Sequence, residues 1–243
     1  MKILIVLPAY NEEIVVAKNT LAVLAFCQKN LSDDFSIVIA DNRSSDRTPE
    51  ISRELATREP NKIFYERFEE KGKGLAWRQT FLKYEADIYI VMDIDLAVEL
   101  TAVIDLIAAI KAGADLAVGS RYLKESKIER TYLRDLTSLV YRSLAKAFLR
   151  SRLSDFQCGF KGINRRLRDE VLPQTQDNLF FLDTEISILS EKLGYRVQEV
   201  PVNWSEFRDL KRKSTVKVAK TVFEYFYKLW QLKKRLGLKK IKN

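Results

Sequence analysis

Two aspartates separated by one residue, Asp93 and Asp95, follow an apolar run at residues 88–92 that is typical of a buried strand. In a strand, residues i and i+2 point to the same side, so both carboxylates could face one cation. Carboxylate oxygens are hard ligands of the kind that bind Mg²⁺ and Mn²⁺. The pair therefore predicts a divalent-metal site that bridges a diphosphate and neutralises a leaving group. The alternative is an ordinary turn or helix-capping pair.

The residues that the chain lacks narrow the chemistry further. The 243 residues include no histidine and only two cysteines, Cys27 and Cys158. This excludes a histidine general base, a Ser-His or Cys-His nucleophile, and a His-rich or Cys-rich zinc site. A metal would have to be held by carboxylates and by phosphate oxygens of a ligand. Two cysteines far apart in the sequence favour a reducing compartment without a disulfide framework.

Strand and helix patterns alternate along the first half of the chain. Apolar runs predict strands at residues 2–7, 36–40, 63–66, 88–92, 116–118 and 196–200. Helical spacing predicts helices near 12–30, 49–58, from the loop at 71–74 to about 85, 100–111, 134–150 and 216–236. The alternation implies an α/β fold with a mostly parallel sheet and helices on both faces. Ligands of such sheets bind in a crevice beyond the carboxyl ends of the strands.

Polar motifs follow four of the predicted strands: PAYNEE, DNRSSDRT, DID and GSR. Their position at the expected crevice indicates a nucleotide-type site. Asp41, directly after the second strand, could accept hydrogen bonds from a uracil or guanine edge, whereas Asp46 and Thr48 are better explained as turn and capping residues. KGKG at 71–74 resembles a phosphate loop before a helix. It lacks the Walker A spacing, and a solvated turn explains it equally well.

Seven motifs occur in the order and spacing of family-2 glycosyltransferases with the GT-A fold: PAYNEE, DNRSSDRT, KGKG, DIDLA, GSRY, DFQCGFKGINR and FLDTEISILSEKLGYRVQEVPVNW. The resemblance covers residues 3–218, and the chain looks like the dolichyl-phosphate glucosyltransferase and dolichyl-phosphate mannose synthase group. QCGFK at 157–161 and DLA at 95–97 are more similar to the glucosyl branch, because the mannosyl branch often has Gln where this chain has Ala97. The resemblance implies inverting transfer from UDP-glucose, with GDP-mannose as the alternative donor and Mg²⁺ or Mn²⁺ as cofactor.

The resemblance also implies roles at matching positions. The residues that would contact the nucleotide-sugar are Pro8, Tyr10, Glu12, Asp41, Lys73 and Asp93. The catalytic group would be Asp93, Asp95 and Arg121, with the two aspartates flanking the metal. The acceptor phosphate would be gripped by Arg121, Arg134 and Ser138. Arg208 or Arg212 would close over the diphosphate, but the chain has Lys-Ser-Thr at 213–215 where the family usually has Gly-Ser-Lys, so the closing residue stays open.

The acceptor decides whether a base is needed. A phosphate monoester has its second pKa near ~6, so at neutral pH it is already an anionic nucleophile. A sugar hydroxyl would require a carboxylate base, for which Asp155, Asp183 and Glu185 are the candidates. For Asp183 and Glu185 a capping role at the start of a helix is an equally good explanation. A family-2 transferase with a saccharide acceptor is therefore the second hypothesis.

Positive charge is concentrated in two segments. The formal net charge is +9, with nine Lys/Arg against three Asp/Glu in 119–153 and thirteen against two in 208–243, which leaves an acidic remainder. The predicted helix at 216–236 has an apolar face that includes Phe226, Leu229 and Trp230, and a basic side that includes Lys228 and Arg235. A weaker stripe of the same kind lies at 133–150. Such helices are typical of membrane interfaces, although a helix packed on the core with a solvated basic side has the same pattern.

These patterns predict two parts of the chain. Residues 1–207 form the catalytic GT-A domain, and residues 208–243 form a basic loop and an amphipathic helix at the membrane interface. Because no run reaches the ~20 apolar residues of a membrane span and the N-terminus lacks a signal-peptide pattern, we expect a peripheral protein on the cytoplasmic face of an anionic membrane. A basic nucleic-acid-binding module is the non-enzymatic alternative, but the sequence contains no RNA-recognition, helix-turn-helix or zinc-knuckle motif.

Overall fold

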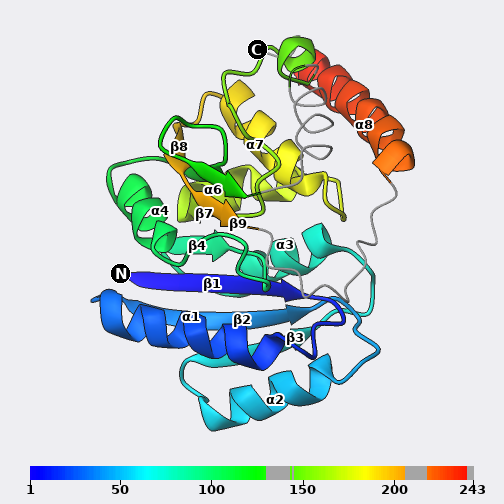
Figure 1. Ribbon diagram of the computed structural model, residues 1–243. Coiled ribbons are helices and arrows are strands. Elements are labelled where there is room, and N and C mark those ends of the chain that lie inside the picture. Colours follow the sequence, from blue (N-terminus) through cyan, green and yellow to red (C-terminus); the bar gives the residue numbers. More distant parts are fainter. Residues whose placement is uncertain (130–142, 144, 206–217, 240–243) are drawn as a thin grey trace.

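The computed structural model describes residues 1–129, 143, 145–205 and 218–239 (Figure 1). Its centre is a sheet in the order β3-β2-β1-β4-β7-β5-β8. The strands are β1 Lys2–Ala9, β2 Asp34–Asp41, β3 Ile63–Arg67, β4 Ile88–Val91, β5 Leu116–Ser120, β7 Lys161–Asn164 and β8 Val197–Pro201. Short β6 Lys127–Glu129 pairs with β9 Asn203–Ser205 in a second sheet. The predicted α/β fold with a mostly parallel sheet is confirmed.

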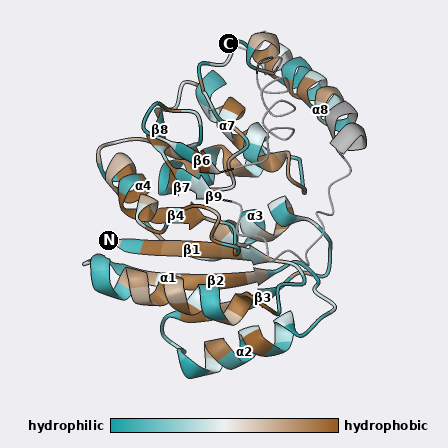
Figure 2. Ribbon diagram, viewed as in Figure 1, coloured by the Kyte–Doolittle hydropathy of each residue, from teal (hydrophilic) through white to brown (hydrophobic). Residues whose placement is uncertain are grey.

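Helices cover both faces of the sheet, as the strand–helix alternation predicts. The helices are α1 Val16–Asn30, α2 Thr48–Arg58, α3 Lys73–Lys83, α4 Ala102–Lys111, α6 Arg165–Glu170, α7 Leu182–Lys192 and α8 Val218–Lys239, with a 3₁₀ turn at Leu172–Gln174. Side chains of α1, α2 and α4 pack on one face of the sheet, and those of α3, α6, α7 and α8 pack on the other. The apolar strands are buried between these layers, which explains their near-continuous hydrophobic runs (Figure 2).

Two features of the sheet were not predicted. β7 lies antiparallel between β4 and β5, and the β6–β9 pair forms beside the main sheet. The four residues KGIN of β7 show neither an apolar run nor a clear alternation, so the sequence gives no strand signal there. The boundaries of the other elements differ from the predictions by a few residues; for example, α1 begins at Val16 and not at residue 12.

The orientation of α8 is not the predicted one, because different side chains face outward. Leu229 and Leu232 are buried against the core, whereas Trp230, which was placed on the same apolar face as Leu229, is 51% exposed. Lys228 and Arg235, expected on a solvated basic side, turn toward the protein body and form ion pairs there. A helix that packs on a domain must bury one stripe, and here the stripe runs through Leu229 and Leu232.

The second amphipathic stripe is described only in part. Residues 145–149 are helical, with Ala145 and Leu149 buried and Ala147 exposed. Most of the predicted helix at 134–150 lies outside the described residues. Within the described ranges no helix is long and apolar enough to cross a bilayer.

Candidate functional site

The loops after β1 and β2 are bound to each other at the carboxyl edge of the sheet. The backbone N–H of Asn11 donates to Ser44 Oγ at 2.9 Å, and that of Glu12 donates to Thr48 Oγ1 at 2.7 Å. Asp46 accepts from the backbone N–H of Thr48 at 3.0 Å, in agreement with the predicted turn role of Asp46, whereas Thr48 is the first residue of α2 and not its cap. The two motifs PAYNEE and DNRSSDRT therefore form one unit beside the crevice.

Asp41 lies at the base of this unit and is fully buried. Its carboxylate accepts hydrogen bonds from Ser44 N at 2.9 Å, from Tyr65 Oη at 2.8 Å and from Arg67 Nη1 at 2.9 Å. Burial and the hydrogen bond to Asp41 raise the pKa of Tyr65 to about 12, so this phenol keeps its proton. The predicted contact of Asp41 with a nucleobase remains a prediction, and in this structure the carboxylate holds β3 and the loop after β2 together.

Asp93 and Asp95 lie in a turn beyond β4, which ends at Val91. The strand alternation invoked for this pair is therefore the wrong reason for their proximity. Leu96 has a positive φ of 52°, and Asp95 Oδ1 accepts a hydrogen bond from the backbone N–H of Ala97 at 3.1 Å. The turn begins where a parallel strand ends, so both carboxylates still lie at the carboxyl edge of the sheet.

Lys73 at the start of α3 links this turn to the rest of the site. Its ammonium forms an ion pair with Asp93 and lies 3.9 Å from Asp183 Oδ2. Burial alone would lower the pKa of Lys73, but the negative charges of Asp93 and Asp183 outweigh burial and raise it, so the side chain stays cationic. A Cβ on Gly159 would lie 2.6 Å from Asp93 Oδ2 and 2.7 Å from Lys73 Nζ, so a larger residue there would force the ends of these two side chains to move.

Asp183 is buried in the first turn of α7 and lies between two lysines. Its Oδ1 is 3.5 Å from Nζ of Lys161, which is 1% exposed and also donates to the backbone carbonyls of Phe156 and Cys158. Lys161 and Gly159 belong to the motif DFQCGFKGINR, but neither was predicted to be a site residue. The motif itself could have indicated a role for Lys161, because a lysine in an apolar stretch needs a buried partner.

Arg121 and Asp155 form a two-pronged ion pair after β5. Arg121 Nε donates to Asp155 Oδ2 at 2.6 Å, and Arg121 Nη2 donates to Oδ1 at 3.0 Å. Burial would raise the pKa of Asp155, but the charge of Arg121 and its hydrogen bonds outweigh burial and hold that pKa below its usual range. This arrangement leaves Asp155 a weak base and keeps the Arg121 guanidinium in a fixed orientation.

The carboxylate of Glu185 is held by hydrogen bonds and an ion pair within the protein. Its carboxylate accepts from the backbone N–H groups of Gln176 and Asp177 and from Arg235 Nη1 at 2.5 Å. The residue is 1% exposed. Glu185 therefore holds the 174–179 segment and α8, and it has no free face toward a substrate.

Of the remaining predicted site residues, the structure describes some and not others. Pro8 is buried at the end of β1, while Tyr10 is 38% exposed with Lys71 Nζ 5.4 Å from its ring centroid. Arg134, Ser138, Arg208 and Arg212 lie outside the described residues. The structure thus brings together Asp93, Lys73 and Asp183 at one edge of the sheet.

The chemistry of the donor set fits Mg²⁺ or Mn²⁺. In the part of the chain that the structure describes, no group of three or more His, Cys, Asp or Glu side chains could hold a metal by itself. Asp93 and Asp95 supply hard oxygen atoms, and the side chain of Asp93 is 42% exposed, so it is open to a ligand. Mg²⁺ usually takes one or two carboxylates together with substrate phosphates and water, which matches a pair of aspartates.

Comparisons with known proteins identify relatives of this chain. The sequence model of glycosyl transferase family 2 matches residues 4–172. Glycosyltransferase AglD of Haloferax volcanii is 32% identical over 87% of this chain and 34% of its own length. The dolichol-phosphate mannosyltransferase of Pyrococcus furiosus is 31% identical over 98% of this chain and 65% of its own. The dolichyl-phosphate beta-glucosyltransferase of Saccharomyces cerevisiae is 29% identical over 83% of this chain and 66% of its own length.

The chain therefore spans about a third of the first of these relatives and just under two thirds of the other two. Among solved structures, glucosyl-3-phosphoglycerate synthase of Mycobacterium tuberculosis, determined with Mn²⁺, UDP and glucosyl-3-phosphoglycerate, superposes with a TM-score of 0.70 at 17% identity, covering 95% of this chain and 79% of that one. This likeness concerns the fold, and it confirms the predicted GT-A architecture.

The Arg121–Asp155 pair predicts a pH-dependent stability. The pKa of Asp155 is depressed in the folded state, so its contribution is complete above its unfolded pKa of ~3.9 and is lost as the pH falls through the folded-state value. Asp155→Asn leaves Arg121 without its partner, so we expect the free energy of unfolding at pH 7 to fall by about 3–5 kcal/mol. The gap to wild type should narrow below pH ~4. Urea unfolding of both proteins between pH 7 and pH 3 measures this difference in the free energy of unfolding.

Glu50→Gln is the control, because Glu50 is exposed and its ion pair in the described part of the chain is with exposed Arg47. It should change stability little at any of these pH values. A gap between wild type and Asp155→Asn that stayed constant down to pH 3 would contradict the assignment.

Proposed function

This chain belongs to glycosyl transferase family 2, and we propose that it transfers a hexose, with inversion, from a nucleotide-sugar to a polyprenyl or dolichyl phosphate. The relatives named above include a dolichol-phosphate mannosyltransferase and a dolichyl-phosphate beta-glucosyltransferase. These names support a lipid-phosphate acceptor for the present chain.

One observation carries the choice of acceptor. Each of the three carboxylates considered as a base is occupied by a cation: Asp155 by Arg121, Asp183 by Lys161 and Lys73, and Glu185 by Arg235. A carboxylate that is ion-paired and buried is a poor proton acceptor, because protonation would leave its cation uncompensated. An acceptor that arrives already ionised needs no base, and a phosphate monoester is such an acceptor. This favours a phosphate over a sugar hydroxyl.

The described residues suggest a division of roles. Lys73, held between Asp93 and Asp183, would meet the diphosphate of the donor, and the loops that carry Tyr10, Glu12 and Asp41 would hold the nucleoside. Arg121 would orient the acceptor phosphate, assisted by Arg134 and Ser138. A divalent ion on Asp93 and Asp95 would neutralise the diphosphate as it leaves.

UDP-glucose is the favoured donor and GDP-mannose the alternative. Support for glucose comes from the QCGFK motif and from the DLA motif, which ends in Ala97. Relatives of both kinds match the chain at similar identity, 31% for the mannosyl enzyme and 29% for the glucosyl enzyme. The donor is therefore a matter for direct measurement.

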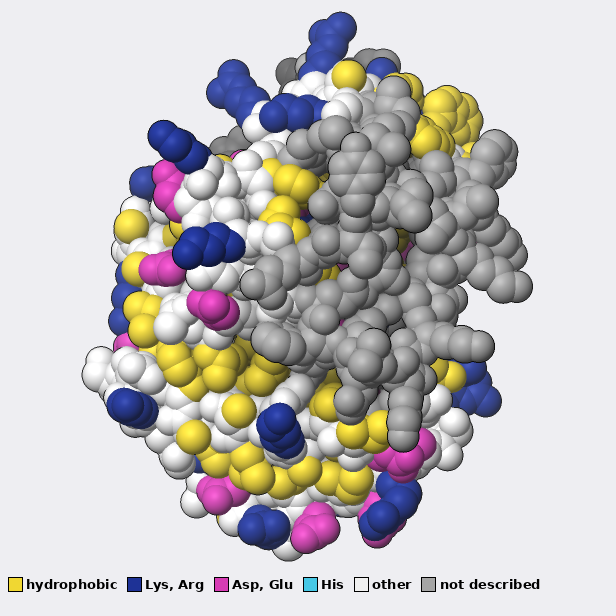
Figure 3. Space-filling view, viewed as in Figure 1, with side chains coloured by type: hydrophobic (Ala, Val, Ile, Leu, Met, Phe, Trp, Pro, Cys, Tyr) yellow, Lys and Arg dark blue, Asp and Glu magenta, His cyan; other side chains and the backbone are white. Residues whose placement is uncertain are grey.

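We also propose that α8 meets an anionic membrane surface on the cytoplasmic side. Its outward side carries Tyr227 and Trp230, 56% and 51% exposed and stacked at 6.2 Å between ring centroids. Lys233 Nζ lies 4.0 Å from the centroid of Phe148, and Lys234 Nζ lies 5.6 Å from that of Trp230. Hydrophobic side chains gather over α8, with Lys and Arg at the same end of the molecule (Figure 3). Exposed aromatic rings beside lysines suit the headgroup region of a bilayer.

The acceptor is tested with a panel of donors and acceptors. We expect UDP or GDP release with Mn²⁺ when a short polyprenyl phosphate is the acceptor, and none with the corresponding polyprenol or an alkyl glucoside. The rate should fall as the pH is lowered past ~6, where the phosphate loses its second charge. Comparing UDP-glucose with GDP-mannose identifies the donor. Equal release with polyprenol or glucoside would instead favour a hydroxyl acceptor.

The metal role is tested with Asp95→Ala. Loss of metal-assisted charge stabilisation, which is worth several kcal/mol, should lower kcat/KM by about a thousandfold. The thermal unfolding midpoint should stay near that of wild type, because the carboxylate is partly exposed in a turn. Asp105→Asn, an exposed change on α4, is the matched control and should be fully active. Full activity of Asp95→Ala, or of wild type in excess EDTA, would refute the metal site.

The membrane surface is tested by vesicle flotation with anionic lipids. Each lysine near such a surface contributes about 1 kcal/mol, so Lys233→Gln should weaken partitioning roughly fivefold. Trp230→Ala should weaken it as well, without a change in thermal stability. Lys29→Gln on α1, at the other side of the molecule, is the control (Figure 1). Retention of the wild-type protein by DNA or RNA, and not by vesicles, at physiological salt would favour the nucleic-acid-binding alternative.

A further inference from the structure

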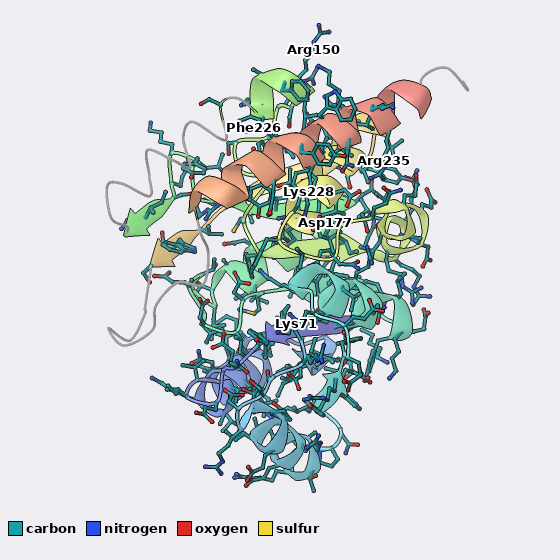
Figure 4. All side chains as sticks on the ribbon, turned by 90° about the vertical axis from the view of Figure 1, so that its right-hand side faces the viewer. Lys71, Arg150, Asp177, Phe226, Lys228 and Arg235 are labelled. Atoms are coloured by element: carbon teal, nitrogen blue, oxygen red, sulfur yellow. The ribbon has the colours of Figure 1, made fainter. Side chains whose placement is uncertain are left out.

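The 174–179 segment lies between the C-terminal helix and the loop that carries Lys73. It follows the 3₁₀ turn at Leu172–Gln174 and leads to α7. Figure 4 shows Lys228 and Arg235 on the side of α8 that faces the body, with Asp177 of the segment next to Lys228. The segment therefore has α8 on one side and α3 on the other.

On the α8 side, two cations hold the segment. Lys228 Nζ forms an ion pair with the carboxylate of Asp177. Arg235 Nη2 donates to the backbone carbonyl of Gln174 at 2.7 Å, while its Nη1 pairs with Glu185 at 2.5 Å. Glu185 in turn accepts from Asp177 N at 2.9 Å. α8 thus reaches the segment both directly and through a buried carboxylate.

On the α3 side, the same segment contacts the glycine-rich loop around Lys73. The backbone N–H of Leu75 donates to the carbonyl of Asn178 at 3.0 Å. A Cβ on Gly72 would lie 2.1 Å from the Asn178 oxygen, and a Cβ on Gly74 would lie 2.5 Å from the Leu179 oxygen. The two glycines on either side of Lys73 therefore have the segment's backbone packed directly against them, and any shift of the segment displaces the loop.

Arg78 adds a second link between α3 and the segment. Its guanidinium donates to the carbonyls of Thr175 at 3.2 Å and Asp177 at 3.3 Å, and to Asn178 Oδ1 at 2.5 Å. The carbonyls of Thr175, Asp177 and Asn178 are thus directed to α3, and the N–H groups of Gln176 and Asp177 are directed to Glu185. Contacts on both sides make it a rigid connection between the two helices.

We infer that Lys228 and Arg235 of α8 are positioning residues for the donor site: through the 174–179 segment they set the place of Lys73, and with it the affinity for the nucleoside diphosphate. Among the described residues, Lys228 pairs with Asp177 and Arg235 pairs with Glu185, whereas Lys73 pairs with Asp93 and Asp183. The effect on Lys73 therefore runs through the segment. The inference rests on the proposed function in one respect, namely that Lys73 meets the diphosphate.

The test measures binding of UDP and of GDP, each with Mn²⁺, by isothermal titration calorimetry on the full chain. For the nucleotide that wild type binds more tightly, Arg235→Gln should raise the Kd about tenfold and Lys228→Gln several-fold. Arg58→Gln is the matched control, because Arg58 makes an exposed ion pair with Glu54 on α2; it should leave the Kd unchanged. Circular dichroism establishes whether each variant is folded. If Arg235→Gln does not fold, the Kd of Lys228→Gln tests the inference.

A purely structural role of α8 is distinguished from an effect through Lys73 by repeating Arg235→Gln and Lys228→Gln in a Lys73→Ala background. If Arg235 and Lys228 act through Lys73, their loss should cause no further weakening there. Equal weakening in both backgrounds, or a Kd unchanged from wild type in Arg235→Gln and Lys228→Gln, would overturn the inference. Wild-type protein that binds neither UDP nor GDP would instead overturn the proposed donor, so the two failures are distinguishable.

Discussion

A row of alternating charges holds the site together: Lys161, Asp183, Lys73 and Asp93. Lys161 is 1% exposed, and Asp183 is the carboxylate that lies 3.5 Å from its ammonium. A buried charge without a partner costs several kcal/mol, so each member of the row depends on the next. Because the four residues come from β7, α7, α3 and the turn after β4, this dependence fixes the relative positions of four elements. Asp93 lies at the exposed end, where a donor can reach it.

The backbone makes this row possible. β2, β1 and β4 are parallel neighbours, so the loops that follow them all open at one edge of the sheet. Gly159 lets the chain pass within van der Waals distance of the Asp93–Lys73 pair, and Gly72 and Gly74 let the 174–179 segment pack on the Lys73 loop. Small residues at these points allow the backbone and the charged side chains to approach closely.

The sequence predicted what depends on local pattern and missed what depends on tertiary contact. The parallel strands and their helices follow from apolar periodicity, and the motifs at strand ends follow from the fold class. β7 could not be predicted, because KGIN has no strand pattern and is held by pairing with β4 and β5. The outward face of α8 was misjudged because Phe226, Leu229 and Trp230 share an apolar stripe, and only packing on the core decides that Leu229 is buried and Trp230 is not.

The same limit applies to the site residues. Spacing alone cannot tell a free carboxylate from a paired one, so Asp155, Asp183 and Glu185 were equal candidates until their partners were known. Arg121, Lys161 and Arg235 are 34, 22 and 50 residues away from them in sequence. In each of these long-range pairs the cation and the carboxylate neutralise each other, so none of these three carboxylates is a free base. For the proposed transfer to a lipid phosphate, electrostatic orientation of ready-made anions would then be the main catalytic task, and none of these three carboxylates would have to move a proton.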